Sequence, residues 1–138
     1  MDDFREMTSD DETASDDTVA LARAAAEAIR GLNHATRCDA GLGQPSAAYD
    51  VIGALSLAAS RLGQLLTQIT GYLDRSLQAG RLGHDLGEDP APDISAAGVF
   101  LDDARASAAA LAGDLNQAQQ QLALINGNPA RRNRKDQP

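Results

Sequence analysis

The clearest pattern along the chain is a heptad repeat of apolar residues over positions 93–126. With Ile94 as position a, every a and d position is apolar, whereas the positions between them carry many Asp, Gln and Asn residues. The apolar positions are Ile94, Ala97, Leu101, Ala104, Ala108, Leu111, Leu115, Ala118, Leu122 and Ile125. A repeat of this length is typical of a helix that packs on another helix along its length. We therefore predict a helix over 93–126, capped by Asp93 and ended by Gly127 and Pro129.

A second long helix is predicted over 46–80, after Pro45 and with Ser46 as its N-cap. With Ala48 as position a, apolar residues fill the a, d and e positions. They are Ala48, Leu55, Leu62 and Ile69 at a, Val51, Ala58, Leu65 and Tyr72 at d, and Ile52, Ala59, Leu66 and Leu73 at e. This face is broad enough to contact two neighbouring helices.

The rest of the chain predicts one shorter helix, two linkers and two disordered ends. The helix, expected over 16–37, has an apolar stripe of Leu21, Ala25, Ala28, Leu32 and Ala35. Residues 1–15 are acidic and lack apolar periodicity, so we expect them to be disordered, as we do the basic tail 127–138. Gly and Pro mark 39–45 and 81–92 as linkers.

Composition agrees with an all-α protein. Aromatic residues make up only 3% of the 138 residues, and the apolar content comes mainly from Ala and Leu, which favour helices. We predict a three-helix bundle built on a long antiparallel hairpin of 46–80 and 93–126. The shorter helix 16–37 is expected to cover the e positions of 46–80.

A stripe of small residues follows another side of the helix 46–80, at spacings of three and four. It consists of Gly53, Ser56, Ser60, Gly63, Thr67 and Thr70. Each interior Gly lowers the stability of a helix by about 1 kcal/mol relative to Ala, so the glycines in this stripe require an explanation. One interpretation is a flat interface for a helix of a second copy or a partner protein. The alternative is a solvated face that the helix tolerates.

No catalytic, cofactor or metal site is predicted. His34 and Cys38 are four residues apart near the end of the first helix, but zinc needs three or four ligands and the only other histidine is His84. We expect His34 to interact with its helix dipole and Cys38 to be a buried thiol. The glycine pairs at 41–43 and 80–83 lack the residues that phosphate-binding loops require.

The net charge of −8 is unevenly distributed. Residues 1–17 carry eight acids against Arg5, which makes the start of the chain unlike a signal peptide, and no stretch is apolar enough to span a membrane. A cytoplasmic protein is therefore expected. The basic tail carries Arg131, Arg132, Arg134 and Lys135. These residues could contact nucleic acid, although the acidic body does not favour that contact.

Residues 20–36 and 49–66, which are rich in Ala and Leu, resemble the small Ala-rich helical proteins of actinobacteria, many of which are uncharacterised or encoded on mobile elements. The resemblance implies a helical fold, but it does not indicate an activity and it transfers no site residues. We therefore expect a non-enzymatic helical adaptor or regulatory partner that self-associates as a dimer. The main alternative is a nucleic-acid-associated accessory protein of a mobile element that uses its basic tail. An enzyme is the third option, which a bound metal or a deep pocket near His34 would favour.

Overall fold

The computed structural model describes residues 3–128, with side chains from residue 10, and these residues form three α-helices, one short 3-10 helix and no strand. The all-α prediction is confirmed. The chain divides into two compact units, Met1–Gly43 and Gln44–Pro138, and each is described by itself. The basic residues 131–135 lie outside the described part of the chain.

The first unit consists of α1 (Asp3–Ala35) and the 3-10 helix η1 (Asp39–Gly41). Helix α1 begins at Asp3, within the segment 1–15 that we expected to be disordered and before the predicted helix start at residue 16. No Gly or Pro precedes Gly31, and acidic side chains near a helix N-terminus interact favourably with its dipole. The described side chains of α1 are all exposed.

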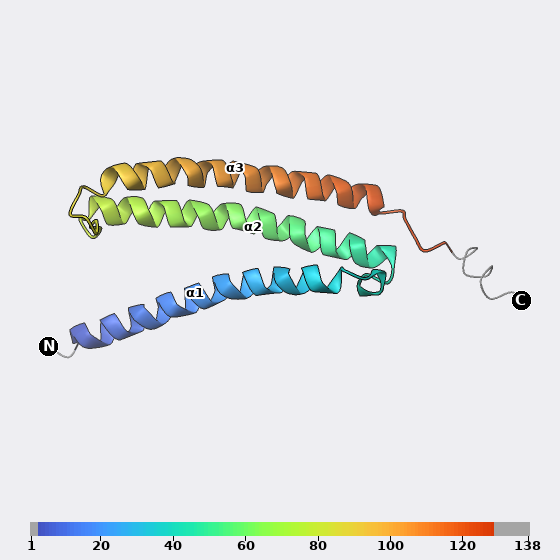
Figure 1. The fold of residues 1–138 in the computed structure, drawn as a ribbon, viewed down its shortest axis with the longest axis horizontal. Helices are drawn as coiled ribbons and strands as arrows, with labels where there is room; N and C mark the ends of the chain where they lie inside the picture. Colours follow the sequence, from blue (N-terminus) through green and yellow to red (C-terminus); the bar gives the residue numbers. More distant parts are fainter. Residues whose placement is uncertain (1–2, 129–138) are drawn as a thin grey trace, which may run out of the picture. The chain divides into compact units, whose positions relative to one another are not determined.

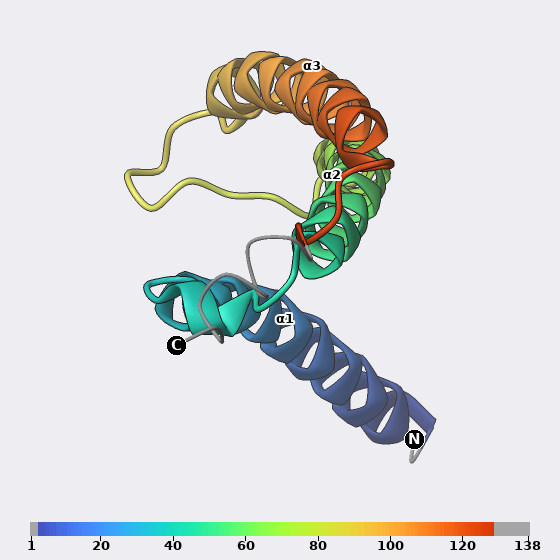
Figure 2. The same ribbon diagram turned by 90° about the vertical axis from the view of Figure 1, so that its right-hand side faces the viewer.

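The second unit is an antiparallel hairpin of α2 (Pro45–Gln78) and α3 (Ala91–Leu122), which lie side by side (Figures 1 and 2). Both helices start and end within a few residues of the predicted bounds. The predicted caps differ. Neither Ser46 nor Asp93 caps its helix: Gln44 and Pro90 occupy the N-cap positions, and proline stands in the first turn of each helix.

The turn after α2 explains why this helix ends where it does. Gly80 has φ +70°, a left-handed conformation that suits glycine. The Arg81 N–H donates to the Ser76 carbonyl at 2.9 Å, and the Gly80 N–H donates to the Leu77 carbonyl at 3.1 Å. This is a Schellman motif, which satisfies carbonyls left free at a helix end. At the start of α3, Asp89 Oδ1 accepts the Ala91 N–H at 3.0 Å.

The line of contact between the two helices differs from the predicted one. The e positions of α2, which we had assigned to the first helix, lie on the side of α2 that faces α3; Ala59 among them is 5% exposed. On α3, the a positions lie on this line, and Ala108 is 5% exposed. The a and d positions of α2 that should have formed the contact include five exposed residues, which are Ala58 and the larger Leu62, Leu65, Ile69 and Tyr72.

Candidate interaction surface

The small residues of α2 lie against α3 of the same chain. The Ser56 hydroxyl donates to the Ala112 carbonyl at 2.8 Å. Thr67 Oγ1 accepts a hydrogen bond from the Arg105 guanidinium at 3.4 Å. One helical turn before the first glycine of the stripe, the Tyr49 carbonyl accepts a hydrogen bond from Gln119 Nε2 at 3.3 Å. These bonds fix the register of the hairpin.

The glycines in this stripe leave room for side chains of α3. A Cβ placed on Gly53 would overlap the Gln119 amide, and a Cβ on Gly63 would lie 3.9 Å from Arg105 Cγ. Small residues at a contact reduce the distance between two helix axes. The observed line of contact on α2 therefore lies farther from the leucines at 62 and 65, and closer to the small residues, than the predicted line.

The stripe of small residues, which we predicted to contact a helix of a second copy or a partner protein, thus contacts α3 of its own chain. Ser56, Gly63 and Thr70 are half-buried, as is Gly53. Ser60 and Thr67 are exposed, and Thr70 donates to the Leu66 carbonyl of its own helix at 3.0 Å. The alternative of a solvated face therefore fits only part of the stripe.

The leucine edge of α2 is left exposed as a result. Leu62 is 45% exposed, Leu65 44%, Ile69 39% and Tyr72 57%. Their spacings of three and four place them on one side of the helix. Each residue advances about 100° around the helix, which puts this edge roughly 60–140° from the line that contacts α3.

α3 contributes a matching exposed edge. Phe100 is 73% exposed and Leu111 is 51% exposed, and the small residues Ala104, Ser107 and Ala118 are exposed on the same side of α3. In an antiparallel pair, residues displaced in the same sense from the contact line lie on the same face of the hairpin. The two edges therefore form one surface, which we call the apolar face. Its residues are Leu62, Leu65, Ile69, Tyr72, Phe100, Ala104, Leu111 and Ala118, with the small polar residue Ser107 among them.

Other exposed apolar side chains of the two helices stand apart from this face. Leu57 is 51% exposed on the outer side of α2, and Val99 is 60% exposed on the outer side of α3. Single exposed apolar residues are normal on protein surfaces, whereas a contiguous patch marks an interaction site. Leu57 and Val99 therefore provide natural controls for the apolar face.

The linker 81–90 closes the loop end of the hairpin. His84 Nε2 lies 3.0 Å from Asp93 Oδ2, and His84 Nδ1 accepts the Leu86 N–H at 3.1 Å. Arg81 donates to the hydroxyl of Ser76, which is 1% exposed. Ser76 lies on the same side of α2 as the leucine edge, so the linker bounds the apolar face at this end. His84 thus has a structural role in the turn.

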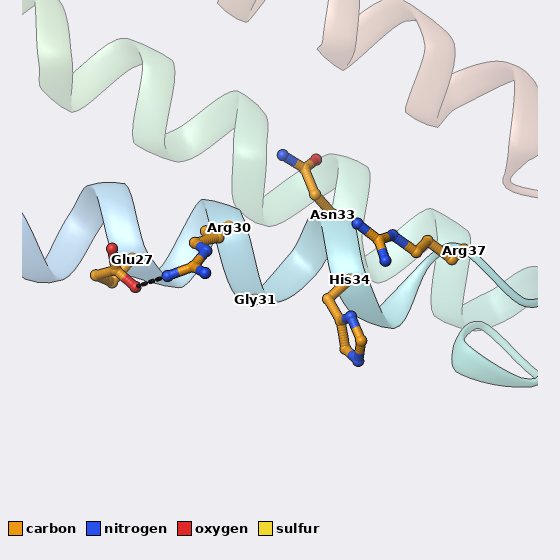
Figure 3. Close-up of a pocket in the computed structure, with 6 residues that line it drawn as sticks. All are labelled: Glu27, Arg30, Gly31, Asn33, His34 and Arg37. Carbon is orange, nitrogen blue, oxygen red and sulfur yellow. Dashed lines mark hydrogen bonds and ion pairs between the residues drawn. The ribbon is translucent and has the colours of Figure 1, made fainter.

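In the first unit, a shallow groove follows one side of α1 near its end (Figure 3). Its lining residues all come from α1 and the turn after it, and Arg30 forms an ion pair with Glu27 at 3.4 Å. Asn33 and His34 both line this groove, and their side chains point to opposite sides of the helix (Figure 3). Cys38 is exposed, so the expectation of a buried thiol is wrong. The chain turns after Ala35, which takes Cys38 out of the helix.

Among residues 3–128, no group of three or more His, Cys, Asp or Glu residues could hold a metal ion. None of the helices in this part of the chain combines the length and hydrophobicity of a membrane span. Comparisons with protein-family models, curated proteins and solved structures gave no match to this chain.

The exposed edges were not predicted from the sequence, although the sequence contains a signal for them. The apolar residues of α2 cover the a, d and e positions, which is wider than contact with one helix requires. Because α3 contacts the e side of α2, the large a and d side chains Leu62, Leu65, Ile69 and Tyr72 remain exposed.

Proposed function

We propose that this protein is a non-enzymatic helical adaptor or regulatory partner, acts in the cytoplasm and self-associates as a dimer through the apolar face of its hairpin. The observation that carries the proposal is the exposure of Leu62, Leu65, Ile69 and Tyr72 beside Phe100 and Leu111. Burying apolar surface contributes about 25 cal/mol per Å², so such a face favours association over remaining in water.

A two-helix hairpin also gains from a partner because it has little core of its own. Among the described side chains, only those of Ala59, Ala108 and Ser76 are buried, with 5%, 5% and 1% of their surface exposed. Alanine contributes a small apolar area, and helices as long as α2 gain most of their stability in proteins from packing. A partner on the apolar face would supply the large buried side chains that the hairpin lacks.

The proposal is tested by measuring the mass of the full chain in solution as a function of concentration, by light scattering and sedimentation equilibrium. We expect a dimer that Leu65→Asp dissociates, because the substitution would bury a charge at the interface. Leu57→Asp is the matched control, since Leu57 is similarly exposed but lies off the face. A chain that stays monomeric at high micromolar concentration, or a dimer equally sensitive to both substitutions, would overturn the proposal.

A further inference from the structure

We propose that the occupant of the apolar face is a second copy placed so that α2 of each chain lies over α3 of the other, with both hairpin loops at the same end. This inference rests on the proposed function and adds the identity and orientation of the partner. The result is a four-helix bundle in which each helix has antiparallel neighbours. Its two-fold axis runs parallel to the helices.

The size of the face fits a dimer. Two helices side by side, each on the order of 50 Å long and about 10 Å wide, present roughly 1,000 Å² on one face. Stable interfaces bury about 800 Å² per partner. A second hairpin has the same length and width, so it can cover the whole face.

The shapes of the two edges are complementary in this arrangement. The contacts of Ser56 with Ala112 and of Thr67 with Arg105 determine which residues of α2 and α3 lie at the same level, that is, at the same height along the helix axes. By this register, the large Leu65 is level with the small residues at 104 and 107, and the small residue at 58 is level with the large one at 111. A two-fold axis parallel to the helices keeps these levels between copies. Large side chains of one helix therefore meet small ones of the partner's helix at both levels.

Ser107 is compatible with a buried position in the proposed dimer. Ser107 is the one polar residue among those named for the apolar face, and it stands level with Leu65. The hydroxyl of a helical serine can donate to a carbonyl one turn earlier in its own helix, so its burial leaves no donor unsatisfied. Its small side chain then leaves space for the leucine of the other copy.

The aromatic residues meet at one level as well. Tyr72 and Phe100 are 57% and 73% exposed, and each lies towards the loop end of its helix. With α2 over the partner's α3, each Tyr72 faces a Phe100 of the other copy. Aromatic pairs of this kind add stability beyond the area that they bury.

Charges at the rim distinguish the two possible orientations. Arg61 is exposed on α2 at the outer border of the apolar face, and Asp103 and Asp114 are exposed on α3 at its other border. With α2 over α3, Arg61 of each copy lies between the two carboxylates of the other. With loops at opposite ends, α2 would lie over α2, which would oppose the two Arg61 residues and bring Asp103 near Asp114. Like charges placed opposite each other are destabilising.

Distance measurement between spin labels tests the orientation in the full chain. The exposed Cys38 is first replaced by Ser, and Gln78→Cys then places a label at the end of α2. Loops at the same end predict a distance of roughly 20–30 Å between the labels, from the spacing of packed helices. Loops at opposite ends predict roughly 50 Å, from the rise per residue.

Charge reversal provides a second, independent readout. At low salt, Arg61→Glu should weaken the dimer about tenfold, and adding Asp114→Arg should restore most of this loss. Arg23→Glu on α1 makes the same charge change and should leave the dissociation constant unchanged. A dimer with the long label distance, or one that Arg61→Glu strengthens, overturns the arrangement but leaves the proposed function standing. A monomer, as when α1 of the same chain covers the face, overturns both.

Discussion

The two edges of α2 carry residues of opposite size, and they have opposite environments. The small-residue edge, with Gly53, Ser56 and Gly63, packs against α3 and forms hydrogen bonds to it. The leucine edge, with Leu62, Leu65 and Ile69, remains 39–45% exposed. The edge with the greater hydrophobicity is therefore not the one that the hairpin buries.

This difference indicates that the distance to which two helices can approach decides which side of a broad apolar face forms the contact within the hairpin. Glycine and serine let the backbone of α3 come near, and the Ser56 hydroxyl then finds the Ala112 carbonyl. The e positions, which border the small residues, become buried as a consequence. The leucines stay available for a second contact.

Replacing one leucine on each of the two sides of α2 by alanine should give the largest difference in the free energy of unfolding. Leu66 is half-buried on the α3 side, so Leu66→Ala should lower the free energy of unfolding by about 2–3 kcal/mol. Leu65→Ala should cost less than about 1 kcal/mol in dilute protein, because Leu65 is already exposed to water.

Urea unfolding at two protein concentrations measures both effects. The cost of Leu65→Ala should grow with concentration, since a dimer interface contributes stability through mass action, whereas that of Leu66→Ala should persist on dilution. Equal costs for the two variants in dilute protein would show that the two edges do not differ as described.

Enlarging Gly63 should test how much room the small-residue edge leaves. A Cβ there would lie 3.9 Å from Arg105 Cγ, an ordinary contact, so Gly63→Ala should stabilise α2 by up to about 1 kcal/mol. Gly63→Leu should instead destabilise the hairpin by about 1–3 kcal/mol, because the longer side chain forces α3 away. The melting temperatures of the two variants should therefore move in opposite directions. A stabilising Gly63→Leu would argue that α3 does not pack here.

Removing the Ser56 hydroxyl should have the smallest effect. Its hydrogen bond to the Ala112 carbonyl joins the two helices, and such a bond contributes about 1 kcal/mol. Ser60→Ala, on the same edge but exposed, makes the same change in helix propensity without that bond. The difference in unfolding free energy between the two variants isolates the hydrogen bond. No difference would mean that water replaces the bond at no cost.

Much of the hairpin could be predicted because its causes are local. The heptad repeat from Ile94 to Ile125 and the turn residues near Pro45 and Gly80 located both long helices within a few residues. The early start of α1 was missed because absence of apolar periodicity was read as disorder. A segment without Gly or Pro can be helical with no apolar face at all.

The side of α2 that contacts α3 differs from the predicted one for a physical reason. The pattern showed one apolar edge and one small-residue edge, and hydrophobicity alone favoured the leucines for the contact inside the chain. The contribution of Phe100 to the surface was also missed, because it lies outside the a and d positions of α3.

The order of residues by itself determined that this chain is helical, where its two long helices run and that one of them is apolar over more than one side. These properties follow from propensity and periodicity, which act within a few turns. Only the tertiary structure decided which edge of α2 meets α3. That choice depends on the distance between two backbones and on hydrogen bonds between residues far apart in the sequence, such as Ser56 and Ala112.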